Sequence, residues 1–282
     1  MDPPLVTLTT DFGTADGYAA AMKGILAARA PAARILDLSH DVPAHDVAAA
    51  AWLLLRAVPF FPPETIHLAV VDPGVGGRRR PLVLELGGQL CVGPDNGVFS
   101  LLPLRLAGPW RAVAIARARV AAAASSSAVF EGRDVFAPAA AALANALLER
   151  EARGSRGQPL DLTRFGDPIP DWLRLPWSEP RREGAEWVGQ IVRVDRFGNA
   201  VTNLTPAHGS GPILAGGRCV GRGRAYEDVP AGSPVALEGS SGFLEIALNR
   251  ASASAALGLA VGDAVRLPAA DAVTAGSPAA GA

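Results

Sequence analysis

Stretches with the period of a β-strand alternate with stretches of helical period along the first half of the chain. Short apolar segments predict strands at 5–9, 34–38, 66–71, 82–86 and 112–116. Helical spacing, with Asp46 as a candidate N-cap, predicts helices at 17–29, 46–57 and about 136–148. Alternation of this kind favours a mostly parallel sheet with helices on its faces. We therefore predict an N-terminal α/β domain over residues 1–165.

The pattern changes in the second half to short apolar segments separated by glycine, serine and proline. Strand candidates lie at 187–194, 200–204, 234–237 and 243–248. This spacing is typical of a small antiparallel β domain, which we place at 186–270. We interpret segment 166–185 as a linker, because most of it is rich in proline, aspartate and tryptophan. The small and alanine-rich residues 271–282 predict a disordered tail.

Composition narrows the class of protein. The chain has 282 residues, 49% of them hydrophobic, and a net charge of −1. It therefore has enough apolar residues for a core, and its charge does not indicate nucleic acid or an anionic membrane as a partner. No apolar run reaches the roughly 18–20 residues of a membrane span. The two distant cysteines, Cys91 and Cys219, and an N-terminus without a signal-peptide pattern favour a cytoplasmic protein.

The turn Asp72-Pro73-Gly74-Val75-Gly76 follows the most apolar strand candidate and is the strongest candidate for a functional site. Its glycines allow the backbone to approach a ligand closely. An arginine run, Arg78 to Arg80, comes shortly afterwards. A carboxylate and a guanidinium at this spacing indicate an orienting pair across a loop. The alternative is a structural turn followed by solvated arginines, and the sequence leaves open which arginine would face the site.

Other polar turns of the first domain also lie where ligands bind. Asp11 follows the first strand, at the edge of the sheet where ligands bind in open α/β folds. It is placed either to accept hydrogen bonds from a ribose diol or only to cap a turn. Phe130 and Glu131 precede the last helix and combine an aromatic ring with a possible base. None of the histidines has convincing metal-ligand spacing, so we expect no metal site.

In the second domain the candidate binding residues are Asp195, Phe197 and Asn199 in one turn, and Ser240 and Ser241 in another. Phe197 is suited to stack on a purine, and Asp195 and Asn199 to bond the polar edge of a base or amino acid. The serines offer hydroxyls and backbone N–H groups to a carboxylate. The alternative for the first turn is a hairpin with a packed phenylalanine.

These motifs are far more specific together, and in this order, than any one of them alone. They are Thr-Thr-Asp-Phe-Gly at 9–13, Val-Asp-Pro-Gly-Val-Gly at 71–76, Gly-Pro-Asp-Asn-Gly at 93–97, Phe-Glu-Gly-Arg-Asp-Val-Phe-Ala-Pro at 130–138 and Asp-Arg-Phe-Gly-Asn at 195–199. With them the chain resembles the S-adenosyl-L-methionine hydroxide adenosyltransferases. These are adenosine-forming S-adenosylmethionine (SAM) hydrolases related to the 5′-fluorinase and 5′-chlorinase. The resemblance covers roughly residues 4–268.

The resemblance implies an N-terminal α/β domain and a smaller C-terminal domain like a β-barrel. It also implies a homotrimer whose substrate lies between subunits, where the N-terminal domain of one meets the C-terminal domain of its neighbour. The implied reaction is attack of water on C5′ of the ribose of SAM, which gives adenosine and L-methionine. SAM is the substrate, and no cofactor or metal is expected.

The resemblance also assigns roles to particular residues. Asp72 and Arg79 match the family's catalytic aspartate and arginine, and Asp11 would hold the ribose hydroxyls. Phe197 and Asn199 would bind the adenine, and Asp195, Ser240 and Ser241 would bind the amino and carboxylate groups of the methionine. Phe130, which precedes Glu131 in its motif, is a further candidate for substrate binding.

The chain departs from the family at Glu131, where the hydrolases usually have a histidine that completes an Asp-Arg-His set. Glu131 would replace that histidine as a base or as an anchor for water. The alternative is a protein that binds SAM or adenosine without turnover. A SAM-dependent 5′-halogenase is disfavoured because Val75 offers no hydroxyl to a halide.

Overall fold

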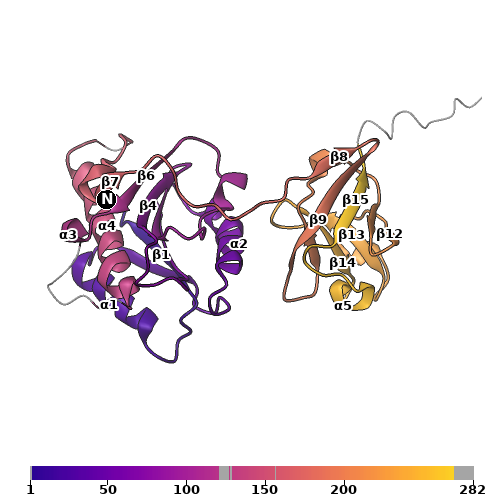
Figure 1. Cartoon of the computed structure of the whole chain (residues 1–282), viewed down its shortest axis with the longest axis horizontal. Helices are drawn as coiled ribbons and strands as arrows, with labels where there is room; N and C mark the ends of the chain where they lie inside the picture. Colours follow the sequence, from indigo (N-terminus) through magenta and orange to yellow (C-terminus); the bar gives the residue numbers. More distant parts are fainter. Residues whose placement is uncertain (1, 121–126, 128, 156, 270–282) are drawn as a thin grey trace, which may run out of the picture. The chain divides into compact units, whose positions relative to one another are not determined.

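The computed structural model describes residues 2–120, 127, 129–155 and 157–269 of the chain (Figure 1). The chain divides between Leu175 and Pro176 into two compact parts, which we call the N-terminal unit and the C-terminal unit. Residues 271–282, which the sequence predicts as a disordered tail, lie outside the described residues.

Within the described residues, the N-terminal unit holds a seven-stranded sheet of order β2-β1-β3-β5-β4-β6-β7. The strands are β1 (Leu5–Thr10), β2 (Arg34–Ser39), β3 (Ile66–Val70), β4 (Pro81–Leu86), β5 (Gln89–Pro94), β6 (Trp110–Ile115) and β7 (Gly166–Pro168). Pairing is parallel from β2 to β5, and β4, β6 and β7 are antiparallel to their neighbours. The predicted α/β sheet with parallel strands is therefore confirmed, and the structure adds an antiparallel edge.

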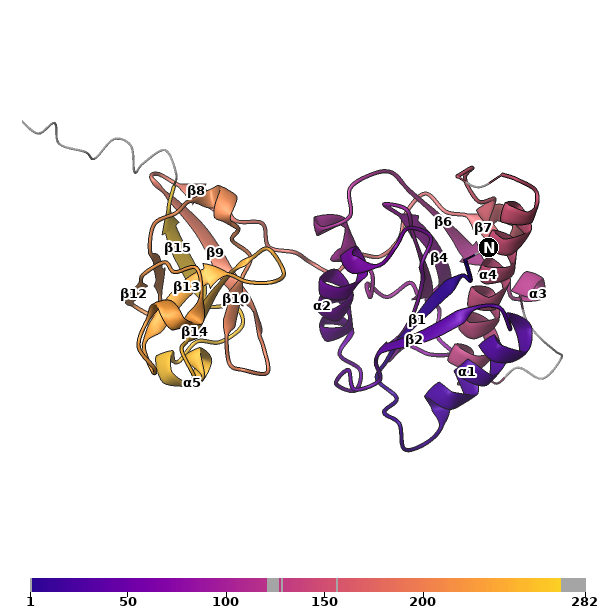
Figure 2. The same ribbon diagram turned by 180° about the vertical axis from the view of Figure 1, so that it is seen from behind.

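Helices cover both faces of this sheet (Figures 1 and 2). They are α1 (Tyr18–Arg29), α2 (Val47–Ala57), α3 (Arg117–Val120) and α4 (Ala137–Ala152), with a π-helical turn at Gly132–Phe136 and 3-10 turns at Val58–Phe60, Leu102–Leu104 and Leu162–Arg164. Helices α1 and α4 pack on one face and α2 packs on the other, each with its own apolar core. As predicted, Asp46 caps α2, because its carboxylate accepts a hydrogen bond from the N–H of Ala49 at 2.8 Å. Among the described residues, no helix has the length and apolar character that a membrane crossing requires.

The described part of the C-terminal unit forms an eight-stranded antiparallel sheet of order β12-β11-β15-β9-β10-β14-β13, with β8 beside β9. Its elements are β8 (Arg181–Glu183), β9 (Glu186–Val194), β10 (Ala200–Thr202), β11 (Ile213–Ala215), β12 (Arg218–Val220), β13 (Pro234–Glu238), β14 (Leu244–Leu248), α5 (Ala253–Leu257), β15 (Ala264–Pro268) and 3-10 turns at Pro206–His208 and Tyr226–Asp228. A bridge between Arg222 and Ala236 joins the two ends of the sheet. The sheet is therefore nearly closed, which confirms the predicted antiparallel, barrel-like domain.

Segment 166–185, which the sequence predicts as a linker, contains a strand near each end. Strand β7 pairs with β6 in the N-terminal unit, and β8 pairs with β9 in the C-terminal unit. Trp172 between them is only 6% exposed, and its ring centroid lies 6.4 Å from that of Trp110. The division between Leu175 and Pro176 falls within this segment, and Trp172 before it belongs to the core of the N-terminal unit.

Candidate active site

Asp11 and Asp72 lie at the same edge of the N-terminal sheet. Asp11 directly follows β1, and Asp72 comes two residues after the end of the neighbouring parallel strand β3. Parallel strands place their carboxyl ends together, so both carboxylates face one cavity of about 490 Å³. Asp11 accepts a hydrogen bond from the backbone N–H of His45 at 2.8 Å. The volume is within the usual range for a site that binds a small molecule.

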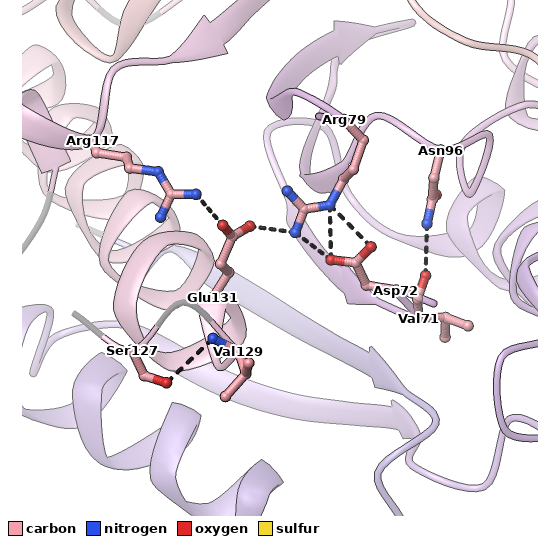
Figure 3. A network of polar contacts seen from close by, with 8 residues as sticks. All are labelled: Val71, Asp72, Arg79, Asn96, Arg117, Ser127, Val129 and Glu131. Carbon is pink, nitrogen blue, oxygen red and sulfur yellow. Dashed lines mark hydrogen bonds and ion pairs between the residues drawn. The ribbon is translucent and has the colours of Figure 1, made fainter. Parts of the chain in front are cut away.

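The side chains of Asp72 and Arg79 form a buried ion pair (Figure 3). Nε of Arg79 lies 3.0 Å from Oδ1 and 2.9 Å from Oδ2 of Asp72, and Nη2 also donates to Oδ2. The two side chains are only 10% and 5% exposed. Such a two-pronged contact fixes the rotation of the carboxylate as well as its position.

Glu131 extends this pair into a row of four charged side chains, which we call the charge network: Arg117, Glu131, Arg79 and Asp72. Nη2 of Arg79 donates to Oε2 of Glu131, and Nη2 of Arg117 donates to Oε1. Figure 3 shows Arg117 and Arg79 on opposite sides of the Glu131 carboxylate. Glu131 is 1% exposed, and it lines the cavity together with Asp72.

Arg79 stays protonated in this environment. Burial alone would lower the pKa of its guanidinium, but the hydrogen bonds and negative charges of Asp72 and Glu131 raise the pKa above its ordinary value. A guanidinium of raised pKa cannot act as a base. Its Nη1 is buried and has no hydrogen-bond partner among the residues that the structure describes. Arg79 therefore serves as a fixed positive charge between the carboxylates of Asp72 and Glu131.

The neighbouring arginines have other roles. Nε of Arg80 lies 2.7 Å from Asp95, its Nη1 lies 2.9 Å from Asp171, and Arg78 is exposed. Of this run, Arg79 is thus the residue that contacts Asp72. The Gly-Pro-Asp-Asn-Gly motif supports the same turn, because Nδ2 of Asn96 donates to the carbonyl of Val71 at 2.8 Å.

Aromatic rings form one wall of the cavity. The centroid of Phe130 lies 6.1 Å from that of Phe12 and 5.1 Å from that of Tyr18. Sequence reasoning identified Phe130 but missed Tyr18 and His45, both of which line the cavity. His45 has a positive φ of 67°, a strained conformation outside glycine that a sequence does not reveal. In the described parts of the chain, no group of three or more His, Cys, Asp or Glu side chains could hold a metal ion.

Asp195, Phe197 and Asn199, three of the predicted binding residues of the C-terminal unit, form a second cluster. Phe197 and Asn199 line a cavity of about 480 Å³ with Tyr226. Asp195 organises the turn, because its carboxylate accepts hydrogen bonds from the N–H groups of Phe197 at 2.8 Å and Asn199 at 2.9 Å and from the side-chain amide of Asn199 at 3.0 Å. Phe197 is 71% exposed and is therefore accessible to a ligand.

Tyr226 is a residue of this cluster that sequence reasoning missed. Its hydroxyl donates to Glu245 at 2.6 Å. Burial, reinforced by the carboxylate of Glu245, raises the pKa of Tyr226, so its hydroxyl keeps its proton at neutral pH. Ser240 and Ser241 lie in the turn between β13 and β14, outside the described lining of this cavity.

Family comparisons match the two units to two successive domains of one family. The SAM hydroxide adenosyltransferase N-terminal domain model matches residues 6–152, and the C-terminal domain model matches residues 189–266. An (R)-S-adenosyl-L-methionine hydrolase of Thermus thermophilus is 45% identical over 93% of this chain and 98% of its own length. A second (R)-S-adenosyl-L-methionine hydrolase, from Salinispora arenicola, is 36% identical over 94% of this chain and 98% of its own length. A fluorinase of an Actinoplanes species is 23% identical over 71% of this chain and 72% of its own length.

Solved structures show the same architecture. An uncharacterised conserved protein from Thermotoga maritima superposes with a TM-score of 0.79 at 30% identity, covering 93% of this chain and 98% of the other. A conserved hypothetical protein from Thermus thermophilus superposes with a TM-score of 0.73 at 40% identity, covering 95% and 100%. The motifs, the fold and these matches agree: the chain belongs to the SAM hydroxide adenosyltransferase family.

Proposed function

We propose that the protein hydrolyses SAM to adenosine and L-methionine, with water attacking C5′ of the ribose. The observation that carries this proposal is the buried carboxylate of Asp72. Both of its oxygens contact Arg79, and it lines the same cavity as Asp11. The relatives' name specifies the R configuration, so we propose (R)-SAM as the preferred substrate.

The chemistry requires one new bond and one broken bond. The water oxygen bonds to C5′, the C5′–S bond breaks, and sulfur keeps the electron pair as the neutral thioether of methionine. One proton of the attacking water passes to a base and then to solvent, and the other stays on the new 5′-hydroxyl. Because sulfur leaves as a neutral group, placing water opposite it is the main task, and orientation of this kind contributes about 7–11 kcal/mol.

We assign Asp72 as the group that orients and deprotonates the attacking water. Its carboxylate is fixed by Arg79 and lines the cavity, so it can accept a hydrogen bond from water and receive the proton. A positioned base contributes roughly 10²–10⁴-fold in rate. Arg79 supports the same role through its charge, since a positive charge paired with Asp72 stabilises the hydroxide character that develops during attack.

The contacts of Glu131 help to decide between hydrolysis and the alternative, a protein that binds SAM without turnover. Glu131 stands where the family has histidine, and it contacts Arg79 and lines the cavity. The Asp72–Arg79 pair therefore keeps a third polar partner despite the substitution, which supports turnover rather than silent binding.

We extend the proposal to the C-terminal unit and to the assembly on the family resemblance. Phe197 and Asn199 bind adenine, and Asp195, Ser240 and Ser241 serve the methionine end. The exposure of Phe197 supports the first assignment. The protein acts as a cytoplasmic homotrimer with sites between subunits. Light scattering coupled to size-exclusion chromatography tests the trimer, and a monomer that retains full activity contradicts shared sites.

The test of function is incubation of the purified protein with (R)-SAM and (S)-SAM separately, followed by chromatography. We expect equal amounts of adenosine and methionine, formed faster from the R isomer. Asp72→Asn is the control: it should lose turnover while calorimetry still detects binding of adenosine. Binding of SAM without product supports the silent alternative, and a 5′-halogenated adenosine formed in chloride or fluoride contradicts hydrolysis.

A further inference from the structure

Both carboxylate oxygens of Glu131 are occupied by guanidinium groups from different elements. Arg79 comes from the loop after β3, and Arg117 comes from the start of α3, after β6. The Glu131 side chain is 1% exposed and that of Arg117 is 47% exposed. A buried carboxylate is thus connected to solvent through an arginine that no motif of the family resemblance includes.

The charges of the network explain why Arg117 matters. Asp72 and Arg79 cancel each other, so a neutral histidine at position 131 would leave that pair balanced. Glu131 adds a negative charge where it is almost fully buried. An uncompensated buried charge is strongly destabilising, and Arg117 supplies the positive charge that balances it.

The contacts of Arg79 show which residues an uncompensated charge on Glu131 would affect. Its Nη2 is shared, because it donates both to Oδ2 of Asp72 and to Oε2 of Glu131. Without Arg117, Glu131 would be left with Arg79 as its guanidinium partner and would compete with Asp72 for this donor. The position of Asp72 in the cavity would then change, although Arg117 does not touch it.

We propose that Arg117 is a positioning residue for the hydrolysis: by neutralising Glu131 it keeps Arg79 aligned on Asp72. Glu131 and Arg117 together take the place of the family's single histidine. This inference rests on the proposed function, since it concerns the same catalytic cavity. Arg117 acts through Glu131 and lies outside the described lining of the cavity, so its loss should lower kcat more than it raises KM for SAM.

The test is a double-mutant cycle on kcat for adenosine release, with Arg117→Met, Glu131→Gln and the double variant. Arg117→Met alone should lower kcat roughly tenfold, the scale of coupling between contacting charged residues. Adding it to Glu131→Gln, where there is no charge to balance, should change kcat less than about twofold. Arg117→Lys keeps the charge and should restore most of the activity. Arg119→Met is the matched control, because Arg119 lies on the same helix and pairs with Asp167 at 3.0 Å.

Several outcomes overturn the inference. Equal losses from Arg117→Met in the wild-type and Glu131→Gln backgrounds would show that Arg117 only supports the structure. No loss in the wild-type background, or a loss that Arg117→Lys does not repair, also contradicts it. If Arg117→Met does not fold, Arg117→Gln in the same two backgrounds replaces it. Absence of adenosine from the wild type contradicts the proposed function itself, whereas adenosine from the wild type without coupling contradicts the role of Arg117 alone.

Discussion

Arg79 holds Asp72 with Nε at 3.0 and 2.9 Å from its two carboxylate oxygens. Both residues belong to the segment that joins β3 to β4, so this loop carries its own charge pair. Nη2 of the same guanidinium reaches Glu131, at the start of the π-helical turn before α4. A planar group with several fixed donors is suited to bridge two carboxylates, whereas a single ammonium is not.

Arg79→Lys should therefore behave as a severe substitution. The lysine keeps the charge but lacks the fixed donors that contact both Asp72 and Glu131, so we expect kcat for adenosine release to fall by about 10²–10³-fold, as for loss of a preorganised donor. Arg78→Lys is the control on the same run, because Arg78 is exposed. Steady-state kinetics measures both. Similar kcat values for the two variants would contradict the role of Arg79.

Asp11 provides a test of ribose recognition. If its carboxylate accepts hydrogen bonds from the ribose hydroxyls, wild-type protein should bind adenosine about 10–100-fold more tightly than 2′-deoxyadenosine, the scale of a hydrogen bond to a charged group. Asp11→Ala should reduce this preference to near unity. Isothermal titration calorimetry with both nucleosides measures it, and a preference that survives in Asp11→Ala places the ribose elsewhere.

Asn96 should support the catalytic turn without being part of the chemistry. Its amide donates to the Val71 carbonyl at 2.8 Å, directly before Asp72. Asn96→Ala leaves that carbonyl without this donor, and we expect a loss of about 1–3 kcal/mol in stability with a drop in kcat. Denaturant unfolding and turnover are the measurements. Unchanged kcat at reduced stability would show that the turn holds Asp72 without Asn96.

His67 predicts a particular dependence of stability on pH. Burial in β3 lowers the pKa of His67 to about 4, although a hydrogen bond with Gln89 opposes the shift. Between about pH 6.5 and 4 the unfolded chain therefore binds a proton that the folded chain does not. Stability that is complete above pH 6.5 should decline by about 3 kcal/mol as the pH falls to 4.

Urea unfolding at several pH values in this window tests the prediction, with His67→Gln as the comparison. Glutamine keeps a donor and an acceptor near Thr7 and Gln89 but does not titrate. The decline between pH 6.5 and 4 should therefore be smaller in this variant, even if the variant is less stable at pH 7. An equal decline in both proteins would assign the effect to other groups.

Local features of the fold and site were predictable from the sequence. The cap at Asp46 and the strand that ends before Asp72 depend on neighbouring residues, and the structure has both. The contact between Asp72 and Arg79 is also local, since one loop supplies both side chains. The residue patterns also predicted the two types of sheet, which the structure shows. The ordered motifs added the family, which the comparisons confirm.

Features that depend on tertiary packing were not predictable. Arg117 reaches Glu131 only because α3 and the π-helical turn meet in the folded chain. Gly93 lies in β5, where a Cβ would come within 2.3 Å of the Ala69 carbonyl, a close approach that the motif alone does not reveal. The strands β11 and β12 are only three residues each, too short for a period to show in the sequence, and pairing with neighbouring strands defines them.

The most direct test of the central claim is hydrolysis of (R)-SAM in water enriched in ¹⁸O, with mass spectrometry of the products. Attack of water on C5′ places the new oxygen in the 5′-hydroxyl, so the account predicts adenosine that carries one ¹⁸O atom and methionine that carries none. Asp72→Asn should release neither product at a comparable rate. Adenosine without the label, or a wild-type protein that binds SAM and releases no adenosine, would contradict the account.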